Sequence, residues 1–140
     1  MAFKGEIIVD TGPLVAFLVG TDRHHSWAAE RFRELRAPFL TCEAVLAETF
    51  YLVARLCDGP GRFFELLDSG LLVGASFDVF SERNTLRKLV RKYADLPMSL
   101  ADACVVRMAE LHDRASVFTV DGQFRIYRKH GRRQIPAILP

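Results

Sequence analysis

The feature of this chain that most constrains its fold is the alternation of short apolar runs with longer amphipathic stretches. Residues 6–10, 38–41, 71–77, 115–120 and 136–139 are short, apolar and bounded by turn-forming residues, which predicts strands. Strands that alternate with helices are joined by right-handed crossovers, and these give a mostly parallel sheet covered on both faces. The sequence therefore predicts an α/β fold.

Seven helical stretches are expected between these strands, near residues 13–19, 25–36, 43–56, 61–69, 79–93, 100–112 and 122–129. Pro13 falls in the first turn of the first helix, where a missing N–H costs nothing. Thr41 and Ser99 are hydroxyl residues of the type that caps helix N-termini. No repeat or linker interrupts the pattern, so residues 1–140 are expected to form a single domain.

Composition narrows the class of protein. Half of the residues are apolar and 26% are charged, which is the balance of a globular chain. No apolar run approaches the roughly 18 residues needed to cross a bilayer, and the first residues lead into a strand without a signal-peptide pattern. Cys42, Cys57 and Cys104 form no metal-binding or disulfide pattern and are predicted to be small buried side chains. A cytoplasmic protein with no membrane association is expected.

Charge is divided unevenly along the chain. The first 70 residues contain 7 Lys and Arg against 10 Asp and Glu, whereas the last 70 contain 12 against 7. The cations gather in residues 83–92 and 125–133. Such a distribution fits a polyanionic partner, because Lys and Arg release counterions from phosphates. A solvated helix face and a polar tail would give the same pattern.

Two acids directly follow predicted strands. Asp10 ends the first strand, and Asp121 follows residues 115–120, with Thr119 two positions earlier on the same side of the strand. The carboxyl ends of parallel strands meet at one edge of the sheet, where the active sites of open α/β proteins form. Asp10 and Asp121 are therefore expected close together, although each also fits an ordinary turn.

Two further acids lie on helices among apolar neighbours. Asp102 and Glu48 have no basic residue at helical spacing. Ser99 and Asp102 match the acidic variant of a capping box, so Asp102 has a structural explanation as well. Glu43 is explained by the helix dipole, whereas Glu48 in the middle of the helix has no such explanation.

Four converging carboxylates predict a metal site. Each close pair would repel by roughly 4 kcal/mol at an effective dielectric constant near 20, which is tolerable only with proton uptake or a bound cation. Oxygen ligands without His or Cys suit Mg²⁺ or Mn²⁺. Such ions activate water for phosphodiester cleavage.

The pattern resembles the PIN-domain family, in particular the VapC-type toxins of bacterial and archaeal toxin–antitoxin pairs. The matching segments are "IIVDTGPLVAFL" (7–18), "HHSWAAERF" (24–32), "LTCEAVLAETFYLV" (40–53), "SLADACVVRMAEL" (99–111) and "VFTVDGQF" (117–124). They occur in the family's order and cover most of the chain.

The resemblance implies a three-layer α/β/α fold with strand order 3-2-1-4-5. It implies that one or two Mg²⁺ or Mn²⁺ ions are held by four acids with two hydroxyls nearby: Asp10, Glu48, Asp102 and Asp121, with Thr11 and Thr119. The implied activity is hydrolysis of single-stranded or loop RNA, by a homodimer that a small antitoxin inhibits. Many relatives have a further acid where this chain has Gln123, which leaves the number of ions open.

Other interpretations remain open at this stage. Arg23, His24, His25 and Trp27 are candidates to border the site, although Trp27 also fits a core position. The chain could be a housekeeping RNA-processing nuclease instead of a toxin, or a binding module whose acids are caps and turns. A phosphatase of the haloacid dehalogenase type would need a second Asp where this chain has Gly12.

Overall fold

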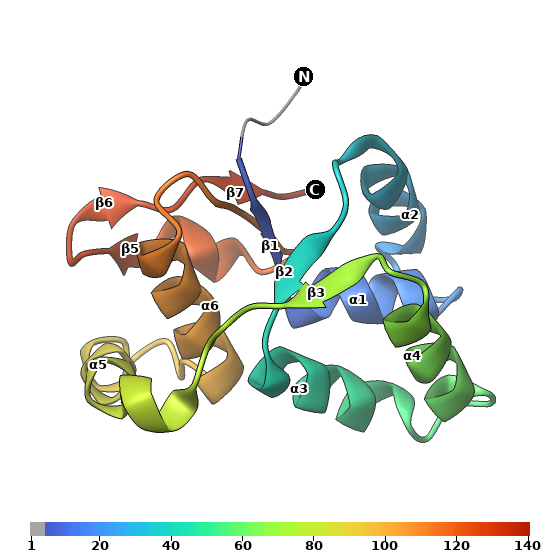
Figure 1. Ribbon diagram of the computed structural model, residues 1–140, viewed down its shortest axis with the longest axis horizontal. Coiled ribbons are helices and arrows are strands. Elements are labelled where there is room, and N and C mark those ends of the chain that lie inside the picture. The colour runs from blue at the N-terminus through green and yellow to red at the C-terminus, as the bar shows by residue number, and fades with distance from the viewer. Residues whose placement is uncertain (1–4) are drawn as a thin grey trace.

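The computed structural model describes residues 5–140, which form a five-stranded parallel sheet with helices on both faces (Figure 1). The sheet order is β3-β2-β1-β4-β7, and every pair in it is parallel. The strands are short: β1 Ile7–Val9, β2 Phe39–Thr41, β3 Leu72–Gly74, β4 Ser116–Phe118 and β7 Ala137–Ile138. The predicted α/β class and strand order are confirmed, with β7 as the fifth strand of the sheet.

The helices fall into two groups. The first contains α1 Thr11–Leu18, α2 His25–Glu34, α3 Glu43–Val53 and α4 Gly59–Asp68, which pack on one another beside the first three strands. The second contains α5 Val79–Lys92 and α6 Leu100–Leu111 in the long crossover from β3 to β4. Figure 1 shows the two groups on opposite sides of the sheet.

Strand β1 is buried in the hydrophobic core at the centre of the molecule. Ile7, Ile8 and Val9 are at most 2% exposed because helices cover both faces of this central strand. Next to it, the Phe118 ring contacts that of Phe32, with centroids 4.9 Å apart, and that of Trp27 at 5.4 Å. A residue that directly follows β1 is therefore held in a largely dry environment.

One predicted helix is wrong. Residues 122–129 were expected to be helical, but only Gly122–Arg125 forms a short 3₁₀ helix, η1. Strand β5 (Arg128–Lys129) follows and pairs antiparallel with β6 (Arg133–Gln134). The turn between them contains His130 and Gly131, both with positive φ, which a helix cannot accommodate. Phe124 and Tyr127 are three residues apart, as buried residues on one face of a helix would be. Phe124 lies in the 3₁₀ helix, however, and Tyr127 in the chain after it, and both are buried.

Two smaller predictions are also wrong. Thr41 is the last residue of β2 and caps nothing; Cys42 precedes α3 and makes no side-chain capping bond. Cys57 is exposed in the loop before α4, whereas Cys42 and Cys104 are buried as predicted. Within residues 5–140, no helix has the length and apolar character to cross a membrane.

Candidate functional site

The predicted acids gather at the carboxyl edge of the sheet. A cavity of about 330 Å³ lies there, lined by Asp10, Thr11, Gly12, Val15, Asp22, Arg23, His24, Glu48, Leu52, Asp102, Val120 and Asp121. All four predicted carboxylates and Thr11 are in this set. Thr119 is fully buried and does not line the cavity itself, but its hydroxyl bonds two residues that do, Asp10 and Asp121. The convergence expected from the strand ends is therefore present in the fold.

Asp10 is the most deeply buried of the four acids, at 5% exposed. Its N–H donates to the Phe118 carbonyl at 2.9 Å, which extends the β1–β4 pairing by one residue. Its side chain makes no capping bond to α1 and accepts one hydrogen bond, from Thr119 Oγ1 at 2.8 Å. Burial raises the pKa of Asp10 to about 7, and the charges of Asp102 and Glu48 add to the rise.

Gly12 lets α1 approach the end of β4. A Cβ on this residue would lie 2.2 Å from Val120 Cγ2, well inside contact distance. No side chain fits here unless Val120 shifts. The second aspartate of a haloacid dehalogenase phosphatase has no space at this position, which argues against that alternative.

Asp102 has both a structural role and a place in the cavity. Its N–H donates to Ser99 Oγ at 3.0 Å, while its Oδ2 accepts the N–H of Ser99 at 3.1 Å, so the predicted capping box is present. Burial raises the pKa of Asp102 despite these bonds, and the Asp121 charge raises it further. The cap and the cavity use the same carboxylate.

Glu48 enters the cavity from the middle of α3, and its side chain takes part in no ion pair within residues 5–140. Its pKa is raised, first by burial and then by the charge of Asp102. The Thr11 hydroxyl lies beside it but outside hydrogen-bonding geometry. Among the described residues, this buried hydroxyl has no hydrogen-bond partner at all. Glu43, at the first position of α3, is exposed and does not line the cavity.

Asp121 forms the turn that was its alternative explanation, and it also lines the cavity. Its Oδ1 accepts the N–H of Gln123 at 2.9 Å, and its own N–H donates to Thr119 Oγ1 at 3.0 Å. The Thr119 hydroxyl thus orients Asp10 and Asp121 together. Gln123 does not line the cavity, because its Oε1 accepts the Tyr127 hydroxyl at 2.9 Å.

The loop after α1 completes the cavity wall. Arg23 and His24 line it as considered from the sequence, whereas Trp27 packs on Phe118. His25 bonds the Ala16 carbonyl through Nδ1 at 2.7 Å. Sequence reasoning missed Asp22, which lines the cavity and accepts the N–H of His24 at 2.8 Å. Asp22 has no strand end or helical pattern to mark it, only its position between two helices.

The donor atoms of this cavity fit a hard divalent cation. They are carboxylate oxygens and the unpartnered Thr11 hydroxyl, the ligand type that Mg²⁺ and Mn²⁺ prefer. None of the ion pairs in residues 5–140 involves the four acids. Within the same residues, no three or more His, Cys, Asp or Glu side chains lie close enough together to hold a metal ion directly. An ion would therefore have to draw the carboxylates together or bind partly through water.

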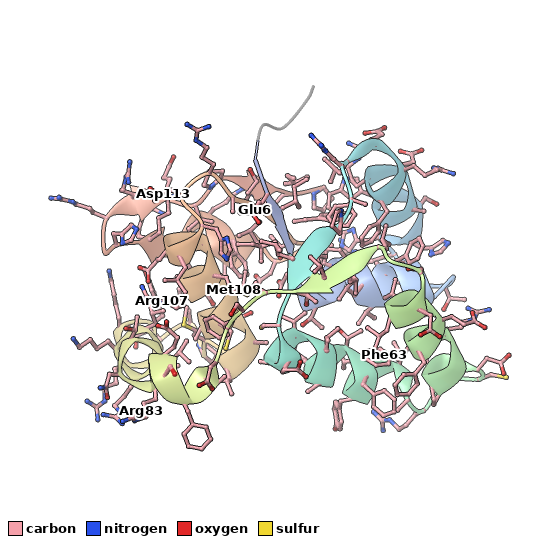
Figure 2. The ribbon with its side chains drawn as sticks, viewed as in Figure 1. Glu6, Phe63, Arg83, Arg107, Met108 and Asp113 are labelled. Carbon is pink, nitrogen blue, oxygen red and sulfur yellow. The ribbon has the colours of Figure 1, made fainter. Side chains whose placement is uncertain are left out.

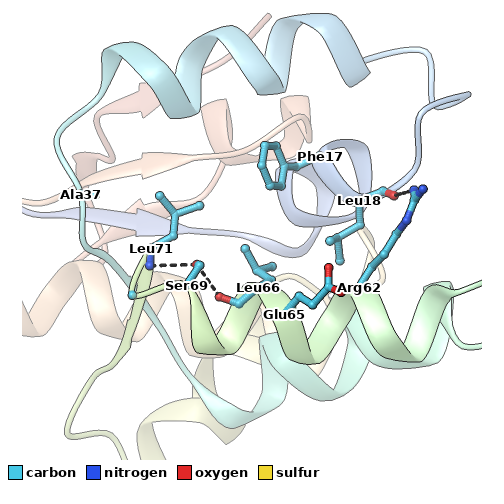
Figure 3. Close-up of a pocket in the computed structure, with 9 residues that line it drawn as sticks. Phe17, Leu18, Ala37, Arg62, Glu65, Leu66, Ser69 and Leu71 are labelled. Carbon is cyan, nitrogen blue, oxygen red and sulfur yellow. Dashed lines mark hydrogen bonds between the residues drawn. The ribbon is translucent and has the colours of Figure 1, made fainter.

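A larger cavity of about 570 Å³ lies away from the acids, between the end of α1 and α4 (Figure 3). Phe17, Leu66 and Leu71 supply much of its apolar wall. Arg62 crosses its rim and donates to the Leu18 carbonyl at 3.1 Å. It has one carboxylate, Glu65, and thus lacks the oxygen cluster of the smaller cavity.

Together, the parallel sheet and the cavity at its carboxyl edge define a three-layer α/β protein with a cluster of carboxylates at the ends of its strands. The family model of the PIN domain matches residues 7–129, and the chain belongs to this family. The structure of Mycobacterium tuberculosis VapC20, described as a sarcin–ricin loop cleaving toxin, superposes with a TM-score of 0.75. It is 22% identical over 91% of this chain and 99% of that one. No curated protein sequence matches this chain.

Proposed function

We propose that this protein is a Mg²⁺- or Mn²⁺-dependent endoribonuclease that cleaves single-stranded or loop RNA. The observation that supports it most is Asp10, a carboxylate buried at the end of the central strand with no cation partner among the described residues. A structural role would have given it a capping bond or an ion pair. A buried carboxylate beside three other acids lowers the stability of the fold, and a bound cation would offset this loss. This is the arrangement expected of a metal ligand.

The side chains divide the work of such a site. Asp10, Glu48, Asp102 and Asp121 would hold the ion, which when bound supplies an activated water and neutralises charge on the scissile phosphate. Thr119 fixes the Asp10 carboxylate through its 2.8 Å hydrogen bond. The Thr11 hydroxyl is free to orient a water molecule or a phosphate oxygen. Arg23 and His24 also line the cavity, where they would contact the RNA backbone.

We further propose that the nuclease is the toxin of a toxin–antitoxin pair and acts in the cytoplasm as a homodimer. The family match and the similarity to a toxin of nearly the same length support this. Exposed apolar side chains of α3 and α4 offer surface for an antitoxin or a second copy: Tyr51 is 68% exposed and Phe64 is 56% exposed. A small upstream reading frame that encodes a DNA-binding N-terminus would favour the toxin over a housekeeping nuclease.

Cleavage of a structured RNA with single-stranded loops tests the central proposal. The wild-type protein should cut in Mg²⁺ or Mn²⁺ and stop on addition of EDTA, and Asp10→Asn should lose at least about 100-fold of the rate, as expected for loss of metal-assisted catalysis. Glu43→Gln, an exposed acid on the same helix as Glu48, is the matched control and should cut normally. The proposal is wrong if wild type at high concentration cuts no RNA in either metal and neither metal changes its thermal stability.

A non-catalytic binding module is the second candidate. The bonds of Asp102 and Asp121 to backbone N–H groups favour it, because these two acids are explained as a cap and a turn. Asp10 and Glu48 are not explained in that way. If the protein is a binding module of this kind, Glu48→Gln should leave both RNA binding and RNA cleavage unchanged.

A further inference from the structure

Helix α5 presents a row of arginines along one face. Arg83, Arg87 and Arg91 are four residues apart and exposed, so they lie above one another on the helix surface. The rise of the helix sets them about 6 Å apart along its axis, comparable to successive phosphates of an extended nucleic acid strand. Figure 2 shows Arg83 pointing away from the body of the molecule.

No acid of the described chain neutralises this row. Glu82 is the acid of the first turn, and it pairs with Arg107 of α6 at 2.7 Å. Asp78 is used as the N-cap, where it accepts the N–H of Phe80. None of the ion pairs in residues 5–140 includes the three arginines of the row. Like charges at this spacing destabilise a helix, so the row has a cost that a polyanion would offset.

A groove of about 430 Å³ runs beside the row. It is lined by Val79, Arg83, Leu86, Arg87, Val90, Arg91 and Leu100. Leu100 is the first residue of α6 and is 52% exposed. Asp102, two residues later and so on roughly the opposite side of the helix, lines the acidic cavity. The start of α6 therefore separates the arginine groove from the carboxylates.

An aromatic side chain stands at the end of the row. Phe80 is 80% exposed, and at three residues before Arg83 it lies on the same helix face. Arg83 Nη1 donates to its carbonyl at 2.6 Å, which holds the guanidinium beside it. An exposed aromatic ring next to a row of cations is the combination that binds single-stranded RNA, by base stacking and backbone contacts.

We infer that the arginine row of α5 (Arg83, Arg87 and Arg91), together with Phe80, binds the single-stranded RNA that flanks the scissile bond. The inference rests on the proposed nuclease function, because it names the surface that presents RNA to the acidic cavity. The three arginines contact successive phosphates, and a base stacks on Phe80. Binding along α5 increases affinity without base-specific contacts, so it selects single-stranded flanks instead of one sequence.

The test compares two triple variants with the same loss of charge. Arg83→Gln/Arg87→Gln/Arg91→Gln removes the row, and Arg33→Gln/Arg36→Gln/Arg55→Gln removes three exposed arginines from the α1–α4 side. Fluorescence anisotropy with a labelled RNA of about 12 nucleotides in EDTA measures binding without cleavage. We expect the row variant to bind about 10-fold more weakly or worse and to lose about 2 from the slope of log affinity against log salt, since each phosphate contact contributes about 0.7. The control should change affinity less than about 2-fold, and Phe80→Ala should weaken binding about 5-fold.

The outcomes separate this inference from the proposed function. If wild type cuts RNA and the row variant binds and cuts it as well as the control does, the inference fails alone. If wild type binds through the row but never cuts, the nuclease proposal fails and the RNA surface stands. The groove could instead bind a second copy of the protein, which light scattering on the same variants tests. If the row variant changes the oligomeric state and leaves RNA affinity unchanged, the groove is a protein interface and the inference is wrong. Circular dichroism should show an unchanged helix content, because all three side chains are exposed.

Discussion

The four acids of the cavity form two pairs that the fold treats differently. Asp102 and Asp121 accept backbone N–H groups, so the capping box of α6 and the turn after β4 use them. Among the described residues, neither Asp10 nor Glu48 caps a helix or closes a turn with its side chain. Removing a member of the first pair harms both structure and site. The second pair is costly to the fold, so its removal separates function from stability.

Asp10→Asn should give the largest effect. The ordinary carboxyl pKa of 3.8 is raised to about 7 by burial. Below about pH 4 the group is protonated in the folded and the unfolded chain. As pH rises from 4 to 7 only the unfolded chain loses the proton, so stability falls over this window and stays low above it. At pH 8 without metal, Asp10→Asn should raise the free energy of unfolding by roughly 2–4 kcal/mol, since one pKa unit is about 1.4 kcal/mol.

Urea unfolding of both proteins at pH 5 and pH 8, in EDTA, measures this effect. The variant should gain more over wild type at pH 8 than at pH 5, while its cleavage activity is lost. A variant that is less stable than wild type at pH 8 would mean that the Asp10 carboxylate supports the fold, and the division into two pairs would not hold.

Divalent metal should act on the same pair. An ion that binds only the folded state stabilises it by about 2.7 kcal/mol at one hundred times its dissociation constant. Thermal melts at pH 8 should show wild type gaining stability with Mn²⁺, and the gain should shrink at pH 5, where the proton competes for Asp10. Asp10→Asn and Glu48→Gln should gain little. An equal gain in Glu48→Gln would place the ion away from α3.

The sequence predicted the convergence of the acids better than the connections around them. Asp10 and Asp121 were found because strand ends and parallel topology are both visible in a single chain, and the order of the sheet followed the family resemblance. The β5–β6 hairpin was missed because its turn depends on positive φ at His130, which a residue pattern does not predict, and because the turn signal of Gly131 was not weighed against the helical spacing before it. Asp22 was missed because only the folded loop brings it to the cavity.

Alanine at Glu48 and Asp102 compares the two pairs directly. Asp102→Ala removes the reciprocal bond of the capping box, a loss of about 1 kcal/mol that exceeds the gain from removing a carboxylate whose pKa burial also raises, so the variant should lose both stability and activity. Glu48→Ala should lose comparable activity with unchanged or slightly higher stability, because its raised pKa shows that burial disfavours the charge. Thermal melts at pH 7 in EDTA measure the difference in stability between the two variants. Equal destabilisation of both variants would contradict it.

The two threonines of the site repeat the comparison on a smaller scale. Thr119 Oγ1 donates to Asp10 and accepts the N–H of Asp121, whereas Thr11 Oγ1 is buried without a partner. Valine has nearly the same shape as threonine, so Thr119→Val should cost about 1–2 kcal/mol by leaving the Asp121 N–H unsatisfied, while Thr11→Val should change stability by less than about 0.5 kcal/mol or raise it. Cleavage should nevertheless fall in Thr11→Val, because its hydroxyl is free for water or phosphate. Full activity in Thr11→Val would show that this hydroxyl serves neither the fold nor the reaction.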